Sequence, residues 1–283
     1  MRKATDIAFK CAAIACALAS CVTLAFILFA ILSRGLPAVS WRFLTEQIRL
    51  VGADGGIFYN LIGTLILITS ALLICTPVAV ALALLESAYL TSAASRRRLR
   101  LLLYVLNGVP SLLFGLFGFV VFVRHLNWGK SWLTGGLLLG FMILPTVSVT
   151  LIERMNQVPR RDLEAATALG LSREQVIWSV LLPQSLGGFI TGALIGVARA
   201  AGETAPILFT ATIFAGATVP RGIHESPVLS LPYHIFILAQ DSFDPAVGAK
   251  VWGAASVLLA LSTLLSLLAL PMRLQIHEEA HAR

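Results

Sequence analysis

Charged side chains are the scarcest feature of this sequence. Only 12% of the 283 residues are Asp, Glu, Lys or Arg, whereas soluble globular domains carry about 25%. Hydrophobic residues make up 58% of the chain. This balance excludes an ordinary soluble domain and indicates an integral membrane protein.

Motifs for catalysis are also missing. A phosphate-binding loop requires GxxxxGK[ST], and the nearest match, 129–131, has Arg124 where the first glycine belongs. GxSxG does not occur, and the one HExxH match, His277 to His281, lies with the other three histidines outside the long apolar runs. The only acid expected inside a span is Glu203. We therefore expect no catalytic residues, neither for ATP hydrolysis nor for an intramembrane enzyme.

The cysteines form no convincing ligand set. Cys11, Cys16 and Cys21 are five residues apart, and Cys75 stands in another run. Helical neighbours face each other at spacings of three or four. We interpret these thiols as small packing groups and expect no metal site.

Long runs without charge predict six transmembrane helices. A bilayer core of ~30 Å needs about 20 apolar residues in a helix. The runs are 11–33, 55–85, 101–123, 131–152, 175–220 (interrupted by Arg199 and Glu203) and 251–272. A further run, 226–240, is too short to span. Lipid offers no partners for backbone N–H and C=O groups, so the fold class is all-α and polytopic.

The first run raises the question of a signal peptide. It runs for 22 uncharged residues at 11–32, of which all but Ser20 and Thr23 are apolar, and this exceeds the usual apolar core of about 7–15 residues. We therefore expect a retained first span, followed by continuous helices over about 59–85, 101–123, 133–152 and 251–270.

Basic residues set the expected orientation. With the N-terminus in the cytoplasm, the inside segments hold 13 Lys or Arg and the outside segments hold 7. This favours cytoplasmic N- and C-termini. The cluster 96–100 is interpreted as a topology anchor beside anionic lipid. The net charge of +7 is then explained by basic residues that flank the membrane spans, and no nucleic-acid partner is expected.

The fifth span contains a charged pair. Arg199 and Glu203 are four residues apart and share a helix face. A helix starting at Pro183 places Arg199 roughly 24 Å along its axis, where arginine costs at least ~2.5 kcal/mol. Gly202 and Pro206 bracket Glu203 and favour local unwinding. The pair is either a structural lock between helices or a site for a charged solute, to which Thr204 adds a hydroxyl.

Small residues recur every four positions in the same span. They are Gly188, Gly192, Gly196 and Ala200. Such a stripe predicts close packing against another helix.

The loop 153–183 is predicted to form two short helices. Pro159 suits the start of the first, and Gly170 suits a left-handed position past its end. Ser172 and Gln175 form a capping box for the second, and Pro183 is expected to separate it from the fifth span. An interfacial amphipathic pair is an alternative. DNA binding is disfavoured because the second helix has few basic side chains.

This loop resembles the signature of type I ATP-binding-cassette permeases. The matching residues are Glu164, Ala165, Ala166, Gly170, Leu182 and Pro183. The resemblance implies a type I (MetI-like) permease fold whose cytoplasmic coupling helices dock on a separate ATPase. Members related to phosphate transporters often have arginine before "EAA", where this chain has Leu163; Arg160 and Arg161 lie a turn earlier.

Longer stretches narrow the resemblance. "GGIFYNLIGTLILI", "VPSLLFGLFG", "RAAGETAPILFTA" and "LPYHIFILAQ" are similar to permease subunits of bacterial phosphate-specific transporters. The implied function is import of inorganic phosphate through Arg199, Glu203 and Thr204. The implied partners are an ATPase dimer that carries ATP and Mg²⁺, a second permease and an extracytoplasmic phosphate-binding protein. The same fold for sulfate, molybdate or an amino acid remains the alternative.

The expected organisation has three parts in a bacterial inner membrane. Residues 1–58 hold the first span and an outer loop, 59–272 hold the permease domain with its coupling loop 153–183, and 273–283 form a cytoplasmic tail. The outer segment 216–250 either meets the binding protein or caps the helix ends.

Overall fold

The computed structural model describes residues 2–49, 54–216, 219–241 and 245–268, and most of them are helical. The predicted tail 273–283 lies outside these ranges. The helices are α1 (Arg2–Gly35), α2 (Trp41–Thr45), α3 (Phe58–Leu84), α4 (Ala93–Asn107), α5 (Ser111–Gly118), α6 (Trp132–Asn156), α7 (Arg160–Ala168), α8 (Arg173–Val176), α9 (Leu182–Gly202), α10 (Ala205–Thr210), α11 (Leu231–Leu238) and α12 (Pro245–Leu268). Strands β1 (Ile48–Arg49) and β2 (Asp54–Gly55) pair antiparallel. Wider π-helical turns extend α3, α5 and α8 at Leu85–Tyr89, Phe119–His125 and Ile177–Leu181.

The number of membrane spans agrees with the expectation. Within the described ranges, five helical segments are long and apolar enough to cross a bilayer: Phe9–Ala38, Phe58–Tyr89, Trp132–Asn156, Arg173–Gly202 and Val247–Leu267. A sixth is formed if Ala93–Asn107 and Ser111–His125, which bend by 87° at their junction, count as one span. The all-α membrane fold is therefore confirmed.

The third span is not the continuous helix that we predicted over 101–123. The chain leaves the helix after Asn107, and Pro110 has an extended backbone with φ −57° and ψ 134°. Proline lacks an N–H, and it disfavours helical geometry in the residue before it, here Val109. The result is two helical arms that meet at a sharp bend.

Helix α6 is the centre of the bundle, with α3 and α9 packed against it. Its buried side chains, among them Leu139, Met142, Ile143 and Val147, join the main hydrophobic cluster of the protein. The predicted small-residue stripe of α9 makes the contact on one side. A Cβ atom at Gly192 would lie 3.1 Å from the Cα of Val147, so α9 sits directly on the α6 backbone.

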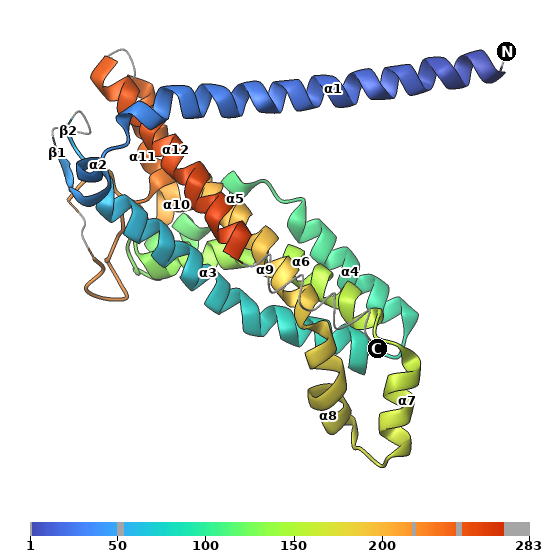
Figure 1. The fold of residues 1–283 in the computed structure, drawn as a ribbon. Helices are drawn as coiled ribbons and strands as arrows, with labels where there is room; N and C mark the ends of the chain where they lie inside the picture. Colours follow the sequence, from blue (N-terminus) through green and yellow to red (C-terminus); the bar gives the residue numbers. More distant parts are fainter. Residues whose placement is uncertain (1, 50–53, 217–218, 242–244, 269–283) are drawn as a thin grey trace.

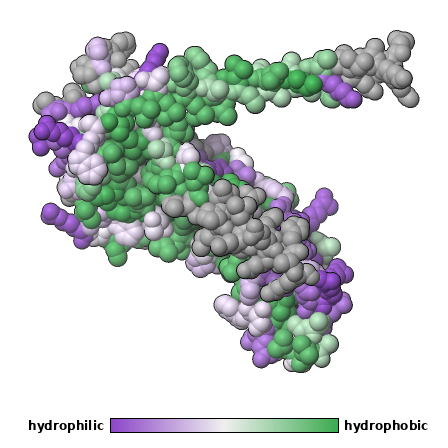
Figure 2. All heavy atoms as spheres, viewed as in Figure 1, coloured by the Kyte–Doolittle hydropathy of each residue, from purple (hydrophilic) through white to green (hydrophobic). Residues whose placement is uncertain are grey.

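Helix α1 lies apart from the rest of the bundle (Figure 1). The C-terminal end of α1 is attached to α12: the Arg34 guanidinium stacks over Trp252, and Ser256 donates a hydrogen bond to the carbonyl of Ile31. The apolar surface of Phe9–Ala38 is otherwise open. Figure 2 shows this surface continuing over the bundle, with hydrophilic residues concentrated at its two ends, as a protein immersed in lipid requires.

The two ends of the bundle are built differently. Helices α7 and α8 project as a knob at one end, while α2, the β-hairpin and α11 lie at the other (Figure 1). Val228, Leu229, Leu231 and His234 are buried, so this part of the outer segment caps the helix ends. The stretch 219–225 is exposed apart from Pro220, which is half-buried. Loops expected on opposite sides of the membrane thus lie at opposite ends.

The knob forms largely as predicted. Helix α7 starts directly after Pro159, Gly170 has a φ of +82°, and Ser172 and Gln175 make both hydrogen bonds of a capping box. The expected break at Pro183 is wrong. Helix α8 continues through the π-helical turn into α9, and the whole segment Arg173–Gly202 is one helical span. The π-helical turn Ile177–Leu181 directly precedes Pro183, and local π-helical adjustments of this kind let a membrane helix continue past a proline.

Candidate functional site

Arg199 and Glu203 lie where a membrane helix is interrupted. Helix α9 ends at Gly202, Glu203 is extended with φ −78° and ψ 129°, and α10 begins at Ala205. Pro206 is in the first turn of α10, which suits a proline because no intrahelical bond is lost there. The predicted local unwinding around Gly202 is therefore confirmed.

The structure brings the two charged side chains together. The Nε of Arg199 lies 3.7 Å from Oε1 of Glu203, and the side chains are 31% and 20% exposed. This distance gives an ion pair without a short hydrogen bond. Arg199 also has a partner that was not predicted: its Nη1 donates to Oδ1 of Asn107 at 2.7 Å.

Asn107 reaches Arg199 because a second helix is interrupted at the same place. It is the last residue of α4, immediately before the bend into α5. Helix α5 then packs so tightly on the start of α10 that a Cβ atom on Gly115 would lie 2.6 Å from the carbonyl oxygen of Ala205. Two helix interruptions therefore meet around one guanidinium. Discontinuous helices of this kind supply substrate sites in many transporters.

The side chains of this group are rich in hydrogen-bond donors, which is the chemistry that an oxyanion would require. Arg199 offers five donors in a planar fork that stays protonated. Asn107 adds amide donors, and the hydroxyl of Thr204, which precedes α10, adds one more. Glu203 supplies a counter-charge. No group of three or more His, Cys, Asp or Glu side chains suited to a metal ion occurs among the described residues.

The sequence contained only a weak signal for Asn107. It stands before Gly108 and Pro110 in a run without charge, and a polar side chain just ahead of a helix break is a reasonable candidate. Its contact with Arg199 spans 92 positions of sequence. Local spacing reveals an i,i+4 pair such as Arg199–Glu203, but it carries no information on a contact between residues this far apart in the sequence.

The knob presents both polar and apolar side chains. Glu164 and Ala165 are exposed, while Ala166 is buried against its own chain. Leu169 and Trp178 are large exposed apolar groups. Leu163 packs against a buried cluster that includes Leu103 and Leu151, which explains why an apolar residue fits there.

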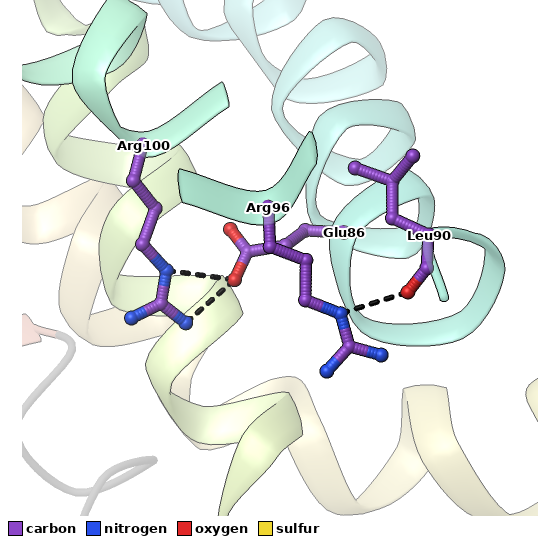
Figure 3. A network of polar contacts seen from close by, with 4 residues as sticks. All are labelled: Glu86, Leu90, Arg96 and Arg100. Atoms are coloured by element: carbon purple, nitrogen blue, oxygen red, sulfur yellow. Dashed lines mark hydrogen bonds and ion pairs between the residues drawn. The ribbon is translucent and has the colours of Figure 1, made fainter. Parts of the chain in front are cut away.

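The basic cluster 96–100 does more than face lipid. Glu86, at the end of the α3 span and 1% exposed, accepts hydrogen bonds from Arg100 Nε at 2.7 Å and Nη2 at 2.5 Å. Arg96 donates to the carbonyl of Leu90 at 2.8 Å (Figure 3). Our interpretation of the cluster as a topology anchor is therefore incomplete, because Arg96 and Arg100 fix the turn between α3 and α4.

The same turn is held from the knob. Arg173 of α8 donates to the carbonyl of Ala88, and its guanidinium lies 4.3 Å from the ring centre of Tyr89. We call Glu86, Ala88, Tyr89, Arg100 and Arg173 the elbow network. It joins α3, α4 and the second knob helix.

The fold and the site define a class: a multi-pass membrane permease subunit with an Arg–Glu pair at an interrupted helix and a helical knob at one end. A sequence model of the family described as "Binding-protein-dependent transport system inner membrane component" matches residues 76–271. The chain belongs to this family, whose members are membrane components of transport systems and not enzymes.

Individual relatives narrow the comparison. The chain is 30% identical to the phosphate transport system permease protein PstA of Pasteurella multocida, over 87% of this chain and 86% of that protein. It is 34% identical to a probable phosphate transport system permease protein PstA of Methanocaldococcus jannaschii, and the match covers 83% of this chain and 82% of that protein. A structure of the MetNI methionine ABC transporter, solved in inward-facing conformations, contains a chain with the same fold. The two chains superpose with a TM-score of 0.58 at 15% sequence identity, and the match covers 78% of this chain and 94% of that chain.

Proposed function

We propose that this chain is the transmembrane permease subunit of an ATP-driven importer of inorganic phosphate, and that it forms the translocation pathway with a second permease. The Arg199–Glu203 pair carries the proposal, because it places a permanent cation at the interruption of a membrane helix. The names of relatives that are 30% to 34% identical support phosphate as the solute. The fold alone does not select it, since a methionine transporter shares that fold.

Phosphate needs such a cation to cross. It carries one or two negative charges at neutral pH, and an uncompensated ion in a low-dielectric medium costs on the order of tens of kcal/mol. The guanidinium of Arg199 matches the oxygens of phosphate, and Thr204 adds a hydroxyl donor. Because Glu203 is held at 3.7 Å rather than in a short hydrogen bond, an arriving anion can replace it. Phosphate then displaces Glu203 from Arg199, and the pair re-forms when the site is empty.

The knob is the proposed contact with the ATPase dimer. The residues assigned to it are Glu164, Ala165, Ala166, Gly170, Leu182 and Pro183. Two short helices with exposed Leu169 and Trp178 fit an apolar groove in a partner, since hydrophobic anchors dominate such contacts. ATP and Mg²⁺ belong to that partner, and this chain binds no cofactor of its own.

Two further partners complete the transporter. The side chain of Arg199 is partly exposed in the single chain, so a second permease has to shield the anion from lipid at that face. The distribution of basic residues assigns both termini and the knob to the cytoplasm. The opposite end, with the exposed stretch 219–225, then faces an extracytoplasmic phosphate-binding protein.

Uptake by the reconstituted transporter tests the proposal. Arg199→Gln should abolish ATP-driven uptake of radiolabelled phosphate while the chain still inserts and assembles. The exposed Arg42 provides a matched control, because Arg42→Gln removes the same charge outside the spans. Excess sulfate, molybdate or amino acid should leave uptake unchanged. Native-rate uptake by the Arg199 variant, or full competition by another solute, would contradict the proposed pathway or the proposed substrate respectively.

A further inference from the structure

Asn107 is the closest polar partner of Arg199, and it belongs to a different helix. Its Oδ1 accepts from Arg199 Nη1 at 2.7 Å. A guanidinium only donates, so the oxygen of the amide has to face Arg199. This leaves both protons of Nδ2 without a protein acceptor in the described part of the chain, and because Asn107 is exposed in the single chain, a solute can reach them.

The end of α4 does not require this side chain. The backbone N–H of Gly108 already closes the helix on the carbonyls of Tyr104 and Val105, both at 3.1 Å. The amide of Asn107 is therefore available for a role beyond capping. A polar side chain near a membrane interior is costly unless it meets a partner, and the partner here is the cation of the pathway.

The two acceptors of Arg199 differ in distance and in charge. Asn107 is neutral and lies at hydrogen-bond distance, whereas Glu203 is anionic and lies at 3.7 Å. An incoming anion repels Glu203 but has no such effect on an amide. Arg199 therefore keeps one fixed partner when the other leaves.

We infer that Asn107 is a positioning and selectivity residue for the transported oxyanion: its Oδ1 aims the Arg199 guanidinium, and its Nδ2 donates to the same anion. This inference rests on the proposed function, in which an oxyanion passes Arg199. It assigns the end of α4 to the pathway, so that the site is formed by residues at the ends of two interrupted helices, α4 and α9.

The test compares three variants in the complete transporter, reconstituted in vesicles with its partner subunits. Phosphate uptake and ATP hydrolysis are measured in parallel at equal amounts of assembled complex. Asn107→Ala should lower uptake at least about tenfold, the order expected for a lost hydrogen bond to a charged group, while ATP hydrolysis stays within about twofold. The phosphate moved per ATP therefore falls.

The other two variants separate the two halves of the amide. Asn107→Gln keeps both the acceptor and the donors and should recover part of the uptake. Asn107→Asp keeps an acceptor for Arg199, loses the donors and adds a charge of the anion's own sign, so its uptake should be at most that of Asn107→Ala. Asn156 also ends a helix and is exposed, and Asn156→Ala is the matched control.

The outcomes are distinct. If uptake and ATP hydrolysis fall together in Asn107→Ala, Asn107 has only a structural role and the inference is overturned. Native uptake in Asn107→Asp would overturn it as well. If Asn107→Ala does not assemble, the comparison of Asn107→Gln with Asn107→Asp decides. If the wild-type transporter moves another oxyanion and no phosphate, the proposed substrate is wrong, and the same variants measured with that anion still decide the role of Asn107.

Discussion

At the scale of residues, one arginine determines the character of the protein. A guanidinium inside a membrane span is stable here because Glu203 balances its charge and Asn107 accepts a hydrogen bond from it. Neither contact saturates its five donors. The charge of Arg199 is therefore compensated, and its remaining donors are available for the proposed anion.

Gly192 provides a test of packing at this scale. Its missing side chain lets α9 touch the α6 backbone, and an added Cβ atom would meet Val147 at 3.1 Å and Thr150 at 3.2 Å. Gly192→Val should destabilise the protein by about 1–3 kcal/mol, as overpacking does. Gly202→Ala is the control from the same helix, because no atom lies within 4 Å of the added group. Thermal unfolding in detergent measures both, and equal melting temperatures would contradict the packing account.

Sequence reasoning at this scale succeeded where the signal was local. The i,i+4 spacing of Arg199 and Glu203 and the flanking Gly202 and Pro206 were sufficient to predict the pair and the unwound turn. Asn107 was missed because its role depends on how α4 and α9 pack together, which no periodicity records.

At the scale of elements, the elbow network connects the turn after α3 with α4 and α8. Glu86 is buried, and its Oε2 has no hydrogen-bond partner among the described residues. Its charge is therefore compensated chiefly through Oε1 and Arg100. Arg173 secures the same turn from the knob.

Removal of Arg100 should be costly. Arg100→Met leaves the carboxylate of Glu86 buried without its cation. Because Arg100 itself is 43% exposed, the loss should be about 1–3 kcal/mol, the range for a lost hydrogen bond to a charged group, and smaller than for a fully buried pair. The double variant Arg100→Met with Glu86→Gln removes the stranded charge and should recover much of that loss. A double-mutant cycle on melting temperatures measures the coupling. Additive losses in the two single variants would show that the pair contributes nothing to stability.

The elements were predictable where end signals are strong. Gly170 and the Ser172–Gln175 capping box were sufficient to predict the turn and the second helix of the knob. Prolines were ambiguous: Pro110 breaks its helix, Pro77 and Pro145 lie inside continuous helices, and Pro183 sits in a first turn. Neighbouring groups and π-helical adjustments decide whether a membrane helix survives a proline, and the sequence does not specify them.

At the scale of the whole molecule, α11 caps the bundle at the end opposite the knob. His234 is buried there, stacked on Phe214 at 5.9 Å between ring centres. Burial lowers the pKa of His234 to about 4 from its ordinary 6.5, and the positive charge of Lys250 acts in the same direction. The cap is therefore built around a neutral imidazole.

The stability of the protein should depend on pH through this residue. Below about pH 6.5 the unfolded chain binds a proton at His234 that the folded chain does not bind until about pH 4. Stability should fall across that window as the pH drops, by roughly 3 kcal/mol in total, and no further below it. His234→Gln should flatten the dependence of melting temperature on pH. The exposed His224 is the control, and an unchanged slope in His234→Gln would contradict this assignment.

The uninterrupted passage from α8 into α9 has a mechanical consequence. Arg173–Gly202 is one helix of 30 residues, roughly 45 Å long, with the proposed ATPase contact at its base and Arg199 near its tip. A tilt of about 5° at the base displaces the tip by roughly 4 Å over that length, comparable with the spacing between Arg199 and Glu203. A flexible joint at Pro183 would absorb such a displacement. Because the helix is continuous there, a tilt imposed at the proposed ATPase contact would move Arg199 directly.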